Sequence, residues 1–115
     1  MPLRLVVAPL AQDQIGRILQ ASTEDFGQTA ADRYRKLLSG AFHLLSRRPD
    51  QPLSRSLLLD DGVVSLFHLR HARRLAPSEE RVASPRHVVV YRYDSACLLV
   101  AQILHDRMDI PARLR

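Results

Sequence analysis

The sequence predicts an α+β fold in which a two-helix hairpin packs on a small, mainly antiparallel β-sheet. Two observations predict it. The first half of the chain carries apolar residues at the three- and four-residue spacing of amphipathic helices. The second half consists of short runs rich in Val, Leu and Tyr that are separated by turn residues. Neither half can bury its apolar side alone, so the helices should cover one face of the sheet.

The first half should contain one strand and two helices. Residues 3–8 (LRLVVA) form a short strand, which we expect at an edge of the sheet. A helix follows over residues 12–24, and a longer helix extends over Gln28–Arg47 with one apolar stripe along it. The short break at Gly27 predicts that the two helices form an antiparallel hairpin.

Three strands should make up the second half, over residues 63–70, His87–Tyr93 and Cys97–His105. The third is apolar on both faces, which is typical of a central strand. The turn at residues 60–62 (DDG) opens the first of these strands, and the polar stretch 72–86 forms a loop. The charged tail should hold one helical turn. The predicted order of elements is therefore β-α-α-β-β-β.

Length, charge and cysteine content limit the possible functions. We expect one domain over residues 1–115, and the single cysteine, Cys97, excludes an intramolecular disulfide. No stretch has the form of a signal peptide or a membrane span, so we expect a cytoplasmic protein without a membrane partner. The net charge of +5 indicates a negatively charged partner, such as nucleic acid or an acidic protein.

Several short motifs appear in the order of these elements. The most specific is the heptapeptide ILHDRMD at residues 103–109. Shorter motifs precede it: FG at 26–27, ADRY at 31–34, FHLRHAR at 67–73, PRH at 85–87 and YR at 91–92. Together they resemble the ParE/RelE toxins of bacterial type II toxin–antitoxin systems, nearer to the ParE branch. The loop at 72–84 is longer than in the shorter ParE chains, so its role is not inherited from the resemblance.

The resemblance implies a toxin that poisons DNA gyrase and inhibits growth, and that acts by binding. A cognate, ParD-like antitoxin would neutralise it, and the antitoxin would bring the pair to operator DNA. No cofactor is expected. Two alternatives remain open at this point: a ribosome-dependent mRNA endonuclease of the RelE type, and a non-toxic protein that only joins the antitoxin in repressing the operon.

RNA cleavage without a metal requires a base, cations that hold the phosphorane charge, and an acid. The chain offers His105 as a base, Arg70 and Arg107 as cations, and Tyr91. The only lysine, Lys36, lies in a predicted helix, and the glutamates lie away from the strands. Because this catalytic set is partial, we favour a toxin without an enzymatic activity.

A toxicity surface is predicted from the charged residues on the sheet and at its ends, namely His105, Arg107, Arg70 and Arg92. Arginine forks pair with carboxylates and with phosphates, so the surface suits gyrase, an acidic antitoxin segment or nucleic acid. His105 closes a strand where the chain meets the charged tail. An equally good interpretation of His105 is structural, as a hydrogen-bond partner that holds the tail, through Asp109.

Antitoxin binding is predicted for a groove between the helices and the sheet, with Ile15, Leu19, Tyr34 and Leu38 as candidates. Burial in the core explains these four residues equally well. We expect no metal site. On a strand, the spacing of His68 and His71 would send the two side chains to opposite faces, and no cysteine or glutamate accompanies them.

Overall fold

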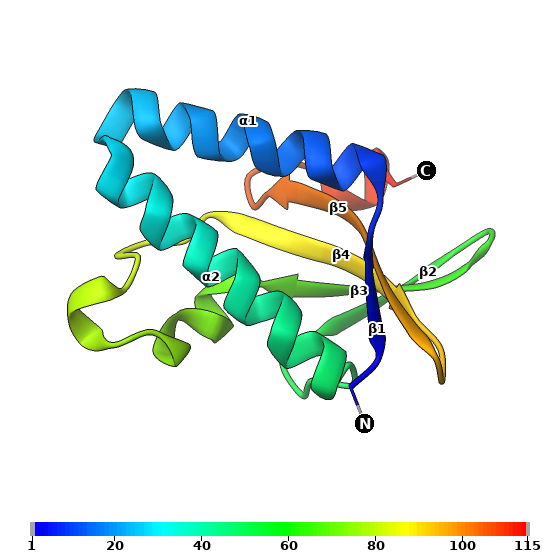
Figure 1. Ribbon diagram of the computed structural model, residues 1–115. Helices are drawn as coiled ribbons and strands as arrows, with labels where there is room; N and C mark the ends of the chain where they lie inside the picture. The colour runs from blue at the N-terminus through cyan, green and yellow to red at the C-terminus, as the bar shows by residue number, and fades with distance from the viewer. Residues whose placement is uncertain (1, 115) are drawn as a thin grey trace.

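The computed structural model describes residues 2–114, which form two helices packed on one five-stranded sheet (Figure 1). The sheet has the order β1-β5-β4-β3-β2. Strand β1 is parallel to β5, and the other neighbouring pairs are antiparallel. The predicted fold class and the edge position of the first strand are therefore confirmed. The strands are β1 (Arg4–Val7), β2 (Arg55–Leu59), β3 (Gly62–His68), β4 (His87–Tyr93) and β5 (Cys97–His105).

The helices are α1 (Pro9–Phe26) and α2 (Gln28–Arg47). Helix α1 begins three residues before the predicted start, because proline is well suited to the first turn, where no N–H is needed. Gly27 joins the helices with a φ of 93°, a conformation that side chains with a Cβ rarely adopt. Its N–H donates to the carbonyl of α1 and its carbonyl accepts from α2, so one residue ends the first helix and begins the second.

The second half holds two kinds of element that the sequence analysis did not predict. Strand β2 pairs with β3 across the predicted turn at residues 60–62. The strand predicted over 63–70 ends at His68, where the 3₁₀ helix η1 (Leu69–Leu75) begins. A second 3₁₀ helix, η2 (Ser78–Glu80), lies within the expected loop. The tail forms the short helix α3 (Ile110–Arg113), as expected for one helical turn.

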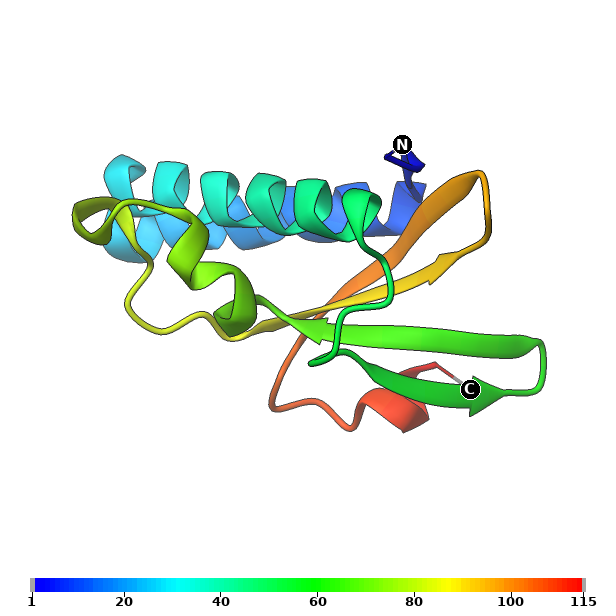
Figure 2. The same cartoon turned by 90° about the horizontal axis from the view of Figure 1, so that it is seen from below.

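Two apolar clusters lie on opposite faces of the sheet. The larger one fills the space between the sheet and the helices, and includes Phe67, Tyr91 and Leu98. The smaller one lies on the far face, where the tail residues Ile110 and Leu114 pack against it. Figure 2 shows this arrangement, with α1 and α2 on one side of the sheet and the C-terminal segment on the other. Among the described helices, none has the length and apolar character needed to cross a membrane.

A bulge between β4 and β5 decides which face the end of β5 presents to the helices. Val90 pairs with Gln102 and Tyr91 pairs with Val100, so one extra residue lies on β5. Ile103 consequently belongs to the helix-side cluster, and the next residue, Leu104, belongs to the far-face cluster. Without the extra residue, the alternation of side chains would reverse at this end of the strand.

Candidate functional site: an arginine-lined hollow

A hollow with a volume of about 490 Å³ lies on the sheet face that points away from α1 and α2. Its apolar part is formed by Leu53, Leu66, Val88 and Ile110, of which Leu66 and Ile110 belong to the far-face cluster. Its polar part includes two histidines, His68 and His71, and one carboxylate. Four arginines also line it: Arg55, Arg70, Arg86 and Arg107.

The topology explains why distant arginines meet here. Because neighbouring strands are antiparallel, the end of β3, the start of β4 and the end of β5 lie together at one end of the sheet. Arg70 follows β3, Arg86 precedes β4 and Arg107 follows β5, so each occupies the junction next to its strand. Arg55 lies on β2, directly opposite Leu66 of β3.

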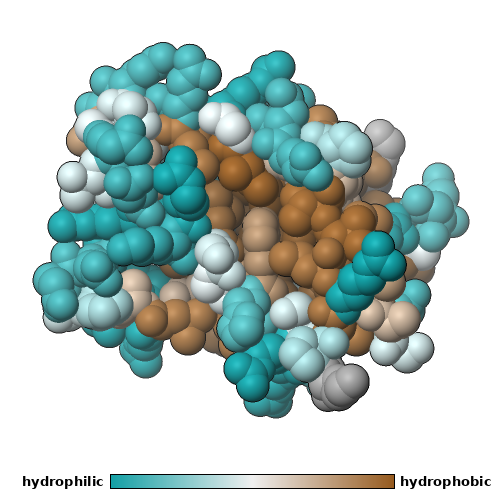
Figure 3. Space-filling view, in the orientation of Figure 1, coloured by the Kyte–Doolittle hydropathy of each residue, from teal (hydrophilic) through white to brown (hydrophobic). Residues whose placement is uncertain are grey.

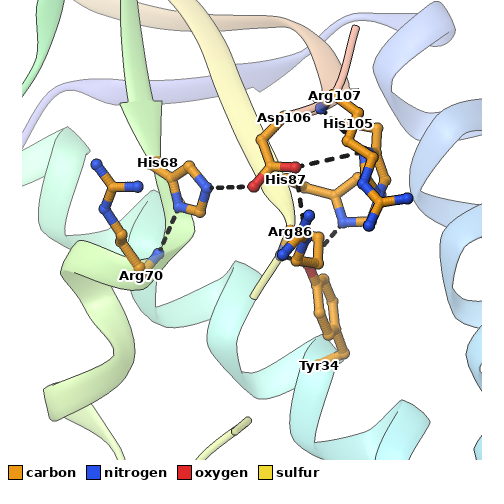
Figure 4. A network of polar contacts seen from close by, with 8 residues as sticks. All are labelled: Tyr34, His68, Arg70, Arg86, His87, His105, Asp106 and Arg107. Atoms are coloured by element: carbon orange, nitrogen blue, oxygen red, sulfur yellow. Dashed lines mark hydrogen bonds and ion pairs between the residues drawn. The ribbon is translucent and has the colours of Figure 1, made fainter. Parts of the chain in front are cut away.

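Asp106 is the carboxylate in the hollow, and Figure 4 shows the residues around it. Its Oδ2 accepts a hydrogen bond of 3.0 Å from Nε2 of His68. Its Oδ1 is buried and lies 3.4 Å from Nε of Arg86 and 3.4 Å from Nδ1 of His105, without a well-directed hydrogen bond. The hydrogen bond from His68 and then the charge of Arg86 lower the pKa of Asp106 below its usual 3.8. The carboxylate is therefore ionised at neutral pH, and it pairs with Arg86.

His68 connects Asp106 to the start of η1. Its Nδ1 accepts a hydrogen bond of 3.0 Å from the backbone N–H of Arg70, so Nε2 carries the proton that is donated to Asp106. The rings of His68 and His71 lie 6.3 Å apart. The expectation that these two histidines occupy opposite faces was wrong, because the strand ends at His68 and the chain turns into a 3₁₀ helix. Burial, followed by the charge of Arg70, lowers the pKa of His71.

A second chain of hydrogen bonds lies behind the hollow, on the helix side. The hydroxyl of Tyr34 accepts from the backbone N–H of Arg86 at 3.3 Å, so its own proton is directed to Nδ1 of His87, at 2.6 Å. His87 is therefore held as a neutral acceptor. Burial and then the charge of His105 lower its pKa to about 4. The rings of His87 and His105 meet edge to face, with their centroids 5.2 Å apart.

His105 lies beside the hollow and does not line it. Its Nδ1 accepts a hydrogen bond of 3.1 Å from the backbone N–H of Arg107, so the ring does hold the start of the tail. The suggested partner, Asp109, was wrong. The Asp109 carboxylate instead accepts from the N–H of Ala112 at 3.4 Å, because the first N–H groups of α3 have no partner within the helix and Asp109 caps them.

The structure separates the residues predicted for toxicity or RNA cleavage. Arg70 and Arg107 share the hollow, and His105 is adjacent to it. Arg92 lies elsewhere and pairs with Asp61 at 2.8 Å, at the turn between β2 and β3. Tyr91 faces the helices and is fully buried at 0% exposure. Its hydroxyl donates to the carbonyl of Pro49 and also contacts Ser54, so this phenol does not face the hollow.

The four residues predicted to bind the antitoxin belong to the core or border it. Tyr34 and Leu38 are only 9% and 3% exposed, and Ile15 and Leu19 are half-buried against the same cluster. They therefore do not line an open groove together. In Figure 3, apolar side chains gather at the surface between the two helices and toward β1. The exposed apolar residues of β1 and the start of α1 are Leu5, Val6 and Leu10.

Five polar members of the hollow were not predicted as site residues: Arg55, His68, His71, Arg86 and Asp106. A signal existed for Arg86, which precedes a strand directly in the PRH motif. Arg55 could have been placed by extending the DDG turn backward into a second strand of a hairpin. Within residues 2–114, no group of three His, Cys, Asp or Glu side chains is arranged to hold a metal ion.

Comparison with known proteins identifies the family. No curated protein sequence matches the chain. A family model described as "ParE toxin of type II toxin-antitoxin system, parDE" matches residues 5–110, which include the whole of the sheet except the first residue of β1, and all four arginines of the hollow. The chain therefore belongs to the ParE family and is the toxin of a type II toxin–antitoxin system, whose partner is an antitoxin.

Proposed function

We propose that this ParE toxin poisons DNA gyrase by binding, and that a cognate ParD-like antitoxin neutralises it and brings the pair to operator DNA. The membership in the ParE family supports the target and the partner. The observation that carries the choice of binding over catalysis is the content of the hollow. It collects four arginines, whereas His68, Asp106 and the Tyr91 hydroxyl are each bonded to other groups of the protein.

Proton transfer to RNA needs an accessible group whose pKa lies near the working pH. Asp106 does not meet this requirement, because its pKa is lowered and its Oδ2 is bonded to His68. Burial raises the pKa of Tyr91, which lies on the other face of the sheet. Nδ1 of His105 accepts the N–H of Arg107. This arrangement favours a surface that binds a target over one that cleaves RNA.

The test of the target uses the purified toxin in two assays. We expect inhibition of gyrase supercoiling, or accumulation of cleaved DNA, and no cleavage of mRNA on ribosomes. Codon-specific cleavage in the ribosomal A site would instead establish the RelE-type activity, with His105, Arg70 and Arg107 as the first residues to test. A toxin that is inactive in both assays and harmless on induction would support the non-toxic operon repressor.

Arg107 is the first residue to change within the proposed toxicity surface. Its side chain is exposed, and its backbone makes the contact with His105, so Arg107→Ala should leave the fold intact and reduce toxicity. Arg33→Ala, on the exposed face of α2, is the matched control and should stay fully toxic. Growth after induction, a melting curve and an antitoxin pull-down are measured together. Full toxicity of a folded Arg107→Ala, His105→Ala double variant would remove this motif from the toxicity surface.

We further propose that an amphipathic antitoxin segment covers the exposed apolar residues beside α1 and β1, next to the half-buried Ile15 and Leu19. Leu10 is 51% exposed in the first turn of α1, where an aspartate is compatible with the helix dipole. Leu10→Asp should therefore keep the fold and weaken antitoxin binding. The control, Leu58→Asp, changes a residue that is 78% exposed on β2 and should bind normally. Equal binding by both variants would place the antitoxin on another surface.

A further inference from the structure

The cations of the hollow outnumber the anions that could neutralise them. Four arginines line it, together with a single carboxylate, Asp106. Arg86 pairs with that carboxylate at 3.4 Å. Among the ion pairs of residues 2–114, none involves Arg55, Arg70 or Arg107. Like charges that converge on one volume without a counterion repel one another, so the hollow is prepared for an anionic ligand.

We propose that this hollow binds the phosphodiester backbone of a single-stranded nucleic acid. The number and origin of the cations favour a polyanion over an acidic peptide. A carboxylate is satisfied by one guanidinium fork, whereas here the forks come from four separate segments of the chain. A backbone that carries one phosphate per nucleotide can place successive charges against successive arginines.

The size of the hollow and its apolar lining favour a single strand over a duplex. A volume of about 490 Å³ lies within the range of pockets that hold small organic molecules, so it accommodates nucleotides one at a time. Its apolar surface, from Leu53, Leu66, Val88 and Ile110, can cover the face of an unstacked base. A duplex keeps its base faces stacked inside and would leave that apolar surface unused.

Arg70 and Arg107 have side chains that are free for this role. Both residues are exposed, and both anchor the local structure through their backbone N–H groups, which donate to His68 and His105. The guanidinium groups contribute none of these bonds, as Figure 4 shows. Replacing both side chains with alanine should therefore remove phosphate contacts and leave the network of histidines and Asp106 in place.

The inference goes beyond the proposed function, because it concerns contact with nucleic acid and not the choice of gyrase. The experiment measures fluorescence anisotropy of the purified toxin with a labelled 12-nucleotide thymidine strand, a matching uridine strand and a 12-base-pair duplex, over a range of salt concentrations. Two double variants are compared with the wild type. The hollow variant carries Arg70→Ala together with Arg107→Ala. The control variant carries Arg33→Ala together with Arg47→Ala on α2 and has the same change in charge.

We expect both single strands to bind more tightly than the duplex. Because each phosphate contact on a single strand contributes about 0.7 to the slope of log K against log salt, the hollow variant should lower that slope by about 1.4. Its affinity at low salt should fall on the order of tenfold, and the control should stay within about twofold of the wild type. Tighter binding of thymidine or of uridine would identify DNA or RNA as the source of the backbone.

Three results would overturn the inference. The first is equal weakening by the hollow and control variants, which would indicate only the overall positive charge. The second is the absence of measurable binding to either strand at low salt. The third is displacement of the strand by a polyglutamate peptide at an equal concentration of negative charge, which would assign the hollow to an acidic peptide. The assay contains no gyrase, so none of these results alters the proposed function.

Discussion

The neutral state of His87 predicts that the toxin loses stability in mildly acidic solution. Nδ1 of His87 accepts the hydroxyl proton of Tyr34 at 2.6 Å, and that hydroxyl already accepts the N–H of Arg86. A protonated His87 carries a proton on Nδ1 as well as on Nε2. The proton on Nδ1 would point at the hydroxyl proton of Tyr34, and the hydrogen bond between the two residues would be lost. The ring of His105 lies 5.2 Å away, so a positive charge has an unfavourable neighbour on that side too.

The magnitude follows from the pKa of His87, which burial and then the charge of His105 lower from 6.5 to about 4. Between these values the folded protein binds fewer protons than the unfolded chain. The contribution to stability is therefore complete above pH 6.5 and is lost as the pH falls toward 4. At about 1.4 kcal/mol per pH unit over this interval of about 2.5 pH units, the upper limit is about 3.5 kcal/mol. Because the ring is partly exposed to solvent, we expect roughly half of this value.

The assay is urea unfolding of the wild type, His87→Asn and His43→Asn at about pH 7.5 and about pH 4.5. Asparagine keeps an acceptor near the position of Nδ1 and does not titrate, so His87→Asn should lose most of the difference between the two pH values. His43 is exposed on α2, and its variant should behave as the wild type does. Asp106 does not interfere, because its lowered pKa affects stability only below its usual value of 3.8. A wild-type difference that persists unchanged in His87→Asn would refute the reasoning.

Two further predictions concern stability at neutral pH and are measured by urea unfolding. Tyr91→Phe removes a buried hydroxyl that donates to Pro49 and should cost about 1 to 2 kcal/mol; an unchanged midpoint would show that this hydrogen bond contributes nothing. Gly27→Ala should destabilise the protein by about 1 kcal/mol or more, because φ is 93° there and no contact compensates. Gly16→Ala, within α1 and also free of contacts, should have the opposite effect, by up to about 1 kcal/mol. Equal effects of the two glycine changes would contradict this assignment of backbone strain.

The fold was predictable where a periodic apolar pattern is long. Helix α2 was predicted to the residue, and β4 and β5 were predicted with their observed bounds. Strand β2 was missed, because its burial is partial and Leu58 is 78% exposed, so no alternation of apolar and polar residues marks it. Its pairing with β3 creates this strand, and such pairing is a tertiary effect that the five residues do not encode alone.

The site was predictable only in part, because it assembles residues from four separate segments. Arg70 and Arg107 were identified, since each follows an apolar run that must end at the surface. Arg92 shares the same local pattern, yet it lies near the other end of β4 and pairs with Asp61. The direction of each strand in the sheet decides this difference, and local patterns do not contain it.

The C-terminal heptapeptide is specific because its consecutive residues lie in different environments. The bulge turns Ile103 toward the helices and Leu104 toward the far face. His105 then faces His87 on the helix side, and Asp106 enters the hollow to bind His68. Substitution of these four residues therefore alters the core, the tail or the charge network together with any function. Arg107 is the first residue of the motif whose side chain makes no such contact, and a change in toxicity on replacing it can be assigned to the surface that meets a partner.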